Sequence, residues 1–234
     1  MKKINLVLIA LVFTLSSCDV LEALIGMAPT APAALTNSEI VAGLKEALNV
    51  GTKNAVGNLS QSGGFLNNPV LKISFPPEAQ KVEEKLRQIG MGKKVDEFIV
   101  NMNKGASEAV KQATPIFANA VKTMSFADAK QILTGPENAA TNYFKNKTSA
   151  ELFKLFQPKV KQTLDQVAVT KYWNDITNIY NKIPFVTKVQ TDLNKYVTDK
   201  AMAGLFVKIA EEEKQIRTDP VARVSAILKK VFGQ

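Results

Sequence analysis

Residues 94–110, KVDEFIVNMNKGASEAV, decide the fold of this chain. Apolar side chains recur here at intervals of three and four residues, at Val95, Phe98, Ile99, Met102, Ala106 and Val110. That spacing places them on one face of a helix with 3.6 residues per turn. The stretch therefore predicts an amphipathic helix that buries one face against a core.

The same periodicity recurs from residue 38 to the C-terminus, between glycine and proline turns and without a detectable repeat. It predicts an all-α fold: a single domain of eight to ten helices over residues 38–234. Ser38 is a candidate N-cap for the first helix. Thr148 and Glu151 have the spacing of a capping box that opens a later helix, which Pro158 is expected to break.

Residues 70–75 alternate between apolar and polar side chains, which is typical of a strand rather than a helix. No second such segment stands nearby, and one strand cannot form a sheet. We therefore expect only a short extended segment or a small hairpin near residues 70–75.

The N-terminus begins with Lys2 and Lys3, and about ten apolar residues follow, as in a secretory signal. Leu15, Ser16 and Ser17 then precede Cys18, an arrangement that resembles the bacterial lipobox. It implies a signal peptide over residues 1–17, a lipid on Cys18, and a flexible tether over residues 18–37. The alternative is an ordinary signal peptide followed by an incidental cysteine.

A lipid on Cys18 predicts a protein of the cell envelope, attached to a membrane and facing the periplasm or the surface. Asp19 resembles the signal that retains enteric lipoproteins in the inner membrane, but in other Gram-negative groups an aspartate at this position does not act as a retention signal. The choice between inner and outer membrane stays open.

The amino-acid composition excludes several kinds of catalytic site. The sequence contains no histidine and a single cysteine, which excludes Ser-His-Asp and Cys-His catalysis and any internal disulfide. We therefore expect a non-enzymatic protein with no cofactor other than the lipid. From Cys18 onward the chain carries 28 basic and 21 acidic residues, a net charge of +7. Export argues against nucleic acid as the partner of this basic chain.

Three polar groups are candidate sites, each with a structural alternative. Asn103 and Glu108, near Asn101, suit a binding pocket or a buried hydrogen-bonded network. Asp128, Thr134 and Thr141 surround two helix starts, where Asp128 would cap and the N–H groups after Gly135-Pro136 could hold an anion. The third group is an ionic cluster with a predicted i,i+4 salt bridge between Glu213 and Arg217; it comprises Glu211, Glu212, Glu213, Arg217 and Asp219.

Two functions follow. The first is binding of an envelope partner or an apolar ligand in a groove between helices, where Trp173 could contribute. The second is hydrolysis of cell-wall glycan by two carboxylates about 5–10 Å apart. Convergent carboxylates in a cleft would favour hydrolysis, whereas carboxylates that are scattered or paired with basic residues would exclude it.

Several stretches together resemble a known family: GLKEAL at 43–48, DAKQILTG at 128–135, ATNYF at 140–144 and EKQIRTDP at 213–220. They are similar to the bacterial family of exported proteins called domain of unknown function 4197, over about residues 38–233. The resemblance implies a helical, exported protein and brings no assigned activity.

Overall fold

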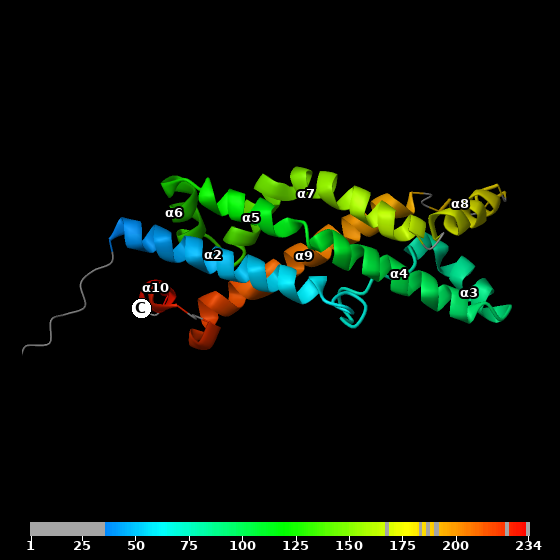
Figure 1. The fold of residues 1–234 in the computed structure, drawn as a ribbon, viewed down its shortest axis with the longest axis horizontal. Helices are drawn as coiled ribbons and strands as arrows, with labels where there is room; N and C mark the ends of the chain where they lie inside the picture. The colour runs from blue at the N-terminus through cyan, green and yellow to red at the C-terminus, as the bar shows by residue number, and fades with distance from the viewer. Residues whose placement is uncertain are drawn as a thin grey trace, which may run out of the picture. The chain divides into compact units, whose positions relative to one another are not determined.

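The computed structural model describes residues 36–166, 169–182, 184–185, 188–189, 192–222 and 225–232, and within these ranges it contains no β-strand. The predicted all-α fold of eight to ten helices is confirmed (Figure 1). The α-helices are α2 (Asn37–Ser60), α3 (Gln80–Gln88), α4 (Gly92–Val110), α5 (Ala113–Lys122), α6 (Phe126–Thr134), α7 (Ala139–Gln166), α8 (Val169–Tyr180), α9 (Leu193–Thr218) and α10 (Ala226–Phe232). Two 3₁₀ turns, η1 (Pro77–Ala79) and η2 (Pro220–Ala222), precede α3 and follow α9.

Residues 35–234 form one compact unit with its own hydrophobic core. Helices α4, α7 and α9 pack against one another in pairs, α2 lies on α9, α4 and α5, and α10 packs on α2 (Figure 1). The signal peptide predicted for residues 1–17, Cys18 and the tether up to residue 35 lie outside the described residues. No helix of the described part is both long and apolar enough to span a bilayer.

Helix α2 begins two residues earlier than predicted, because its N-cap is Thr36 rather than Ser38. The Thr36 hydroxyl accepts from Glu39 N (3.3 Å), and Glu39 Oε2 accepts from Thr36 N (2.9 Å), a complete capping box. Glu39 also binds Lys230 Nζ of α10 (2.6 Å). The bond from Lys230, with those from Thr36, lowers the Glu39 pKa from 4.5 to about 2.

Helix α7 corrects two predictions. The capping box predicted at Thr148 is wrong: the helix runs on through it, and the Thr148 hydroxyl donates to Phe144 O (2.6 Å). The predicted break at Pro158 is also wrong, because Pro158 is exposed inside the helix and its ring disturbs only the solvent side. A buried stripe at four-residue spacing holds the helix through both points: Phe144, Thr148, Leu152, Phe156, Val160 and Leu164.

The segment at 70–75 is neither a strand nor a hairpin in the described chain. Its first two residues belong to a turn in which Leu71 N and Lys72 N donate to Asn68 O (3.2 and 2.9 Å), and residues 72–74 have no regular secondary structure. Its alternation is reflected in burial, since Leu71, Ile73 and Phe75 are buried while Lys72 and Ser74 are exposed. A strand needs a partner for its backbone groups, and here a side-chain amide takes that place, as described below.

Candidate functional site

Glu213 is the centre of the most connected polar group in the described chain. Its carboxylate, 5% exposed, accepts from Ala140 N (3.0 Å), Thr141 N (2.9 Å) and the Thr141 hydroxyl (2.8 Å). Arg217 donates to the same carboxylate from Nη2 (2.9 Å) and Nε (3.2 Å), which confirms the predicted i,i+4 salt bridge. Arg217 Nη2 also donates to Ile132 O of α6 (3.0 Å). The group thus ties α9 to α6 and α7.

The helix start after Gly135-Pro136, whose N–H groups could hold an anion, binds the protein's own Glu213. The N–H groups of Ala140 and Thr141 belong to the first turn of α7, where the helix dipole favours negative charge. Because a side chain of α9 already satisfies them, this helix start is a structural joint and does not offer its N–H groups to a ligand.

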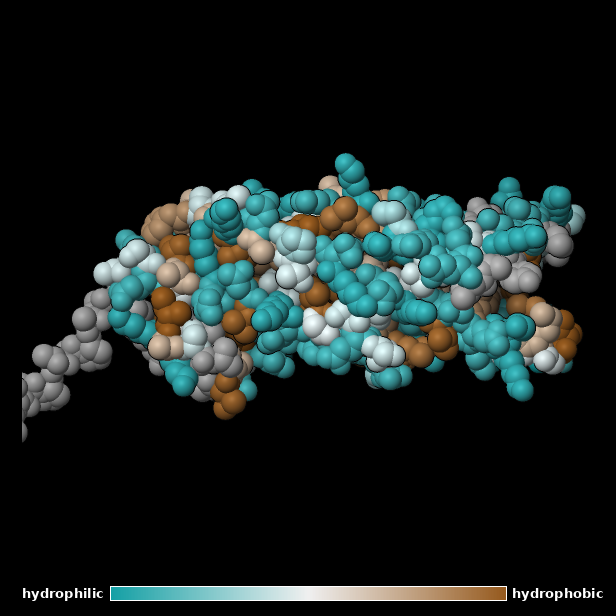
Figure 2. Space-filling model, viewed as in Figure 1, coloured by the Kyte–Doolittle hydropathy of each residue, from teal (hydrophilic) through white to brown (hydrophobic). Residues whose placement is uncertain are grey.

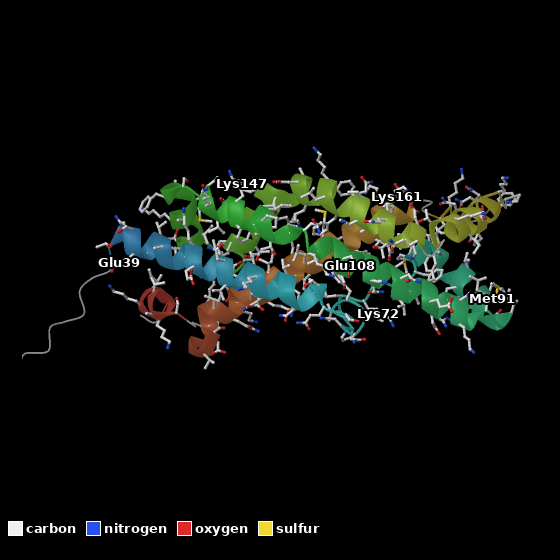
Figure 3. The ribbon with its side chains drawn as sticks, in the orientation of Figure 1. Glu39, Lys72, Met91, Glu108, Lys147 and Lys161 are labelled. Carbon is white, nitrogen blue, oxygen red and sulfur yellow. The ribbon has the colours of Figure 1, made fainter. Side chains whose placement is uncertain are left out.

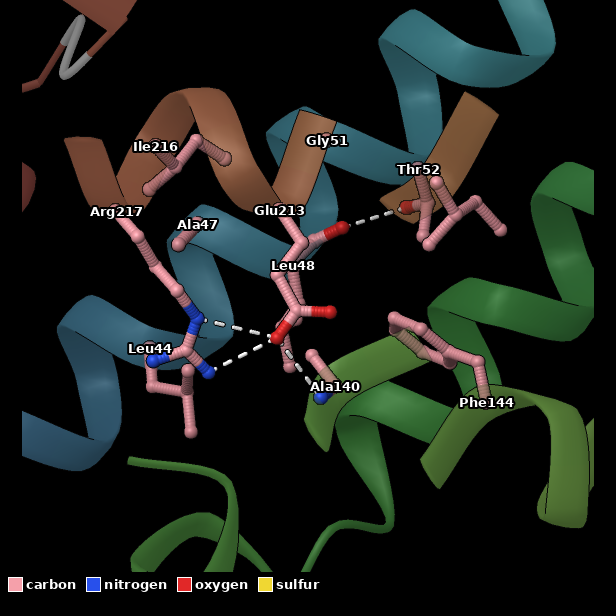
Figure 4. Close-up of a pocket in the computed structure, with 11 residues that line it drawn as sticks. Leu44, Ala47, Leu48, Gly51, Thr52, Ala140, Phe144, Glu213, Ile216 and Arg217 are labelled. Atoms are coloured by element: carbon pink, nitrogen blue, oxygen red, sulfur yellow. Dashed lines mark hydrogen bonds and ion pairs between the residues drawn. The ribbon is translucent and has the colours of Figure 1, made fainter. Parts of the chain in front are cut away.

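A small cavity lies beside this joint (Figure 4). It has a volume of about 30 Å³ and is walled by α2, α7 and α9, with apolar side chains such as Leu48, Phe144 and Ile216. In Figure 4 the Glu213 carboxylate points towards Ala140 and Arg217. A volume of this size suits one water molecule rather than an organic ligand.

Asn103, the second candidate, is 1% exposed and pairs with the backbone of Ile73. Its Oδ1 accepts from Ile73 N (2.9 Å), and its Nδ2 donates to Ile73 O (2.8 Å) and to Ile99 O (2.8 Å). The amide thus supplies the hydrogen bonds that a neighbouring strand would give. Of the two alternatives for Asn103, a binding pocket or a buried hydrogen-bonded network, the structure shows the network.

Sequence reasoning missed a second amide of the same kind. Asn181 Nδ2 donates to Val189 O (3.1 Å), and Val189 N donates to Asn181 Oδ1 (2.8 Å). No local pattern marks Asn181, because its partner is a single buried valine eight residues further along.

The remaining predicted residues each have a local partner. Asp128 caps α6 in a box with Ser125, whose hydrogen bonds hold the Asp128 pKa below its usual value. The Thr134 hydroxyl donates to Lys130 O (3.0 Å), and Asp219 Oδ1 accepts from Val221 N (2.8 Å). Glu108 pairs with Lys111 on the surface of α4 (2.7 Å). The structure therefore brings only Thr141, Glu213 and Arg217 of the predicted set into direct contact.

The carboxylates of α9 do not converge on a cleft. Glu211 pairs with Lys208 (2.5 Å), and Glu212 accepts from Asn54 Nδ2 of α2 (2.9 Å). Glu213 is committed to Arg217 and α7. Nor does the described chain gather three or more acidic, histidine or cysteine side chains that could hold a metal ion. This arrangement lends no support to carboxylate-dependent hydrolysis.

A much larger cavity, of about 560 Å³, lies between α3, α4 and α8. Apolar side chains make most of its wall: Phe75, Val82, Leu86, Met91, Val95, Phe98, Trp173 and Ile176. The volume falls within the usual range for small-molecule pockets, about 300–1,000 Å³. We call it the α3–α4–α8 cavity.

Three aromatic rings from distant parts of the chain form one end of this wall. Phe98 of α4 lies 4.7 Å from Phe75 and 5.5 Å from Trp173 of α8, measured between ring centroids, and Phe75 lies 5.9 Å from Trp173. Such tilted and edge-on contacts fix aromatic rings against one another. Because Asn103 anchors Ile73, it also positions Phe75 two residues later.

The polar part of the lining comes from one helix only. Lys94, Glu97 and Asn101 follow one another at spacings of three and four along α4. Lys94 Nζ pairs with Glu97 Oε2 (2.9 Å), and Asn101 Nδ2 donates to Glu97 O (2.8 Å). The cavity is thus apolar on most sides and has one polar stripe, which suits a ligand with a long apolar body and one polar end.

Comparison with known proteins gives a family and nothing more. The sequence model of a family described as protein of unknown function, DUF4197, matches residues 34–233. No curated protein and no solved structure matches the chain. The match spans most of the 234 residues, so the chain belongs to the DUF4197 family.

Proposed function

We propose that this member of the DUF4197 family is a cell-envelope lipoprotein, attached through Cys18, that binds an amphiphilic ligand in the α3–α4–α8 cavity. The observation that carries the proposal is the cavity of about 560 Å³ with its apolar and aromatic wall. An apolar ligand that binds here removes the apolar wall and its own apolar surface from water, which favours binding. The apolar run before Leu15-Ser16-Ser17-Cys18 supports the anchor.

The paired carboxylates of α9 favour binding over hydrolysis. Ligand binding needs only a shaped apolar space with a few polar groups, whereas glycan hydrolysis needs two carboxyl groups that face the same bond. The α3–α4–α8 cavity provides the first, and its one acidic lining residue, Glu97, is held by Lys94.

The test uses Trp173, which is the only tryptophan in the sequence and lines the cavity. Residues 35–234, the compact unit with its own core, are titrated with dibromostearate, because bromine quenches indole emission on contact. Saturable quenching is expected, while unbrominated stearate should compete with it. Emission that stays unchanged at saturating dibromostearate would refute the proposal.

Leu86→Lys and Leu155→Lys form a matched pair for this titration. Leu86 lines the cavity, whereas Leu155 is 39% exposed on α7. A charge in the apolar wall opposes burial of an alkyl chain, so Leu86→Lys should weaken binding by about tenfold or more, or 1.4 kcal/mol. Leu155→Lys should bind as the unchanged chain does. Equal affinities would place the ligand outside this cavity.

A further inference from the structure

The turn between α3 and α4 exposes apolar side chains at the edge of the cavity. Ile89 is 70% exposed and Met91, which lines the cavity, is 42% exposed. Figure 3 shows Met91 at the far tip of this helix pair, and Figure 2 shows brown, apolar surface at the same tip. Two exposed apolar side chains this close together are typical of a surface that binds an apolar partner or a membrane.

The backbone of this turn is held in one conformation. Gly90 has φ +84°, in the left-handed region where a side chain would be strained. Met91 N donates to Leu86 O (2.9 Å) and Gly90 N to Arg87 O (3.1 Å), which closes the end of α3. The exposure of Ile89 and Met91 is therefore built into the turn.

Basic side chains flank the turn. Of the four in residues 85–94, Arg87 pairs with Glu83 and Asp96 and Lys94 pairs with Glu97. Lys85 and Lys93 have no acidic partner among the described residues and are the two charges that a bilayer could attract. An apolar tip between basic side chains is the pattern of segments that lie in the interface of an anionic bilayer. Each basic residue close to such a surface contributes about 1 kcal/mol of attraction.

We infer that the α3–α4 turn inserts into the headgroup region of a bilayer, and that the cavity receives the acyl chain of a membrane lipid past Met91. The inference rests on the proposed function, since it names the ligand class and its source. An alkyl chain would lie against Val82, Leu86 and the aromatic rings. Its polar end would stay at the stripe of Lys94, Glu97 and Asn101.

An anchor at Cys18 is compatible with this orientation. Residues 19–35 can span at most about 60 Å when fully extended, at about 3.5 Å per residue. Helix α2, with 24 residues, is about 36 Å long at 1.5 Å per residue. The start of α2 and the α3–α4 turn lie at opposite ends of the helical unit (Figure 1), so the tether allows the turn to meet the bilayer when the unit lies along the membrane.

The experiment compares two double variants of the full-length lipoprotein, reconstituted in vesicles of phosphatidylcholine with a minor share of phosphatidylglycerol. The turn pair is Ile89→Asp with Lys93→Gln, at two residues that do not line the cavity. The control pair is Val70→Asp with Val221→Asp, at side chains that are 79% and 84% exposed. Quenching of Trp173 is measured with vesicles whose phospholipid chains are dibrominated, and separately with monomeric dibromostearate.

We expect the unchanged chain and the control pair to be quenched by the brominated vesicles. The turn pair should be quenched at least about threefold less, because carboxylates resist burial in a bilayer. Monomeric dibromostearate should still quench it. Vesicle quenching of the turn pair equal to that of the control pair would overturn the inference. So would loss of both signals in the turn pair, since Ile89 and Lys93 would then be needed for the shape of the cavity itself.

The failures of the two proposals can be told apart. If monomeric dibromostearate leaves Trp173 of the unchanged chain unquenched, the proposed function fails. If the monomer quenches but brominated vesicles do not, only uptake from the bilayer fails.

Discussion

Glu213→Gln tests the joint that holds α9 to α6 and α7. The amide keeps the shape of the side chain, but one oxygen becomes an NH₂ group that faces donors from Arg217 or Thr141. Removing one partner of a buried ion pair costs about 3–5 kcal/mol. Arg217 is 20% exposed and keeps its bond to Ile132 O, so we expect the lower end, about 3 kcal/mol.

The assay is urea unfolding of residues 35–234, followed by far-UV circular dichroism, with thermal unfolding beside it. For a unit of this size, 3 kcal/mol corresponds to a fall in Tm of about 6–12 °C. Glu211→Gln is the matched control, because Glu211 lies two residues earlier, is 48% exposed and pairs with Lys208. An exposed pair contributes less than about 1 kcal/mol. The reasoning is refuted if the free energies of unfolding of Glu213→Gln and Glu211→Gln differ by less than about 0.5 kcal/mol.

Three further outcomes are expected. Asn103→Asp should lower the free energy of unfolding, measured in urea, by about 2–3 kcal/mol, because a carboxylate cannot donate to Ile73 O. Hydrogen exchange at residues 70–75 should also rise. Protection of these residues equal to that of the unchanged chain would contradict this prediction. The bonds that lower the Glu39 pKa from 4.5 to about 2 stabilise the contact between α2 and α10 fully above pH 4.5. This stabilisation should disappear as the pH falls to about 2 and Glu39 becomes protonated. Hydrogen exchange in α10 should rise over that window, and a flat profile would contradict the pairing. Val82→Phe, which fills the cavity, should cost less than about 1 kcal/mol, whereas Val197→Phe in the close-packed core should cost about 1–3 kcal/mol in the same urea titration; equal losses would mean that the cavity is not open.

Helical periodicity carried most of the fold prediction. The apolar spacing in residues 94–110 matches α4, whose buried face includes Val95, Ile99, Met102 and Val110. Local signals failed where tertiary packing opposed them. At Thr148 and Pro158 the sequence shows a start and a break, but the buried stripe of α7 continues through both and outweighs them.

The polar joint was partly predictable. The four-residue spacing of Glu213 and Arg217 predicts their salt bridge, whereas the hydrogen bonds between Thr141 and Glu213 join residues far apart in the sequence. No local pattern can reveal such a contact. An amide beside an apolar stripe needs hydrogen-bond partners, which marks Asn103 as a candidate, but no local pattern identifies Ile73 as its partner.

The cavity could not be predicted from the sequence. Val82, Leu86 and Phe98 have the spacing of ordinary core residues, and the same pattern results whether their helices close on one another or stand apart. What opens the space is the placement of α3 and α8 around α4, which depends on contacts between distant segments. Trp173, which the sequence suggests for a groove between helices, is 2% exposed and forms part of the cavity wall.

The most direct test of the central claim is an isotope-filtered nuclear Overhauser experiment on residues 35–234. The methyl groups of the chain are labelled with carbon-13, and unlabelled stearate is the ligand. Binding in the α3–α4–α8 cavity predicts cross-peaks from the alkyl chain to Ile176, Val82 and Leu86. Ile216, which lines the cavity of about 30 Å³, should show none. Cross-peaks to Ile216 without Ile176, or none to any methyl group at saturating stearate, would contradict the account.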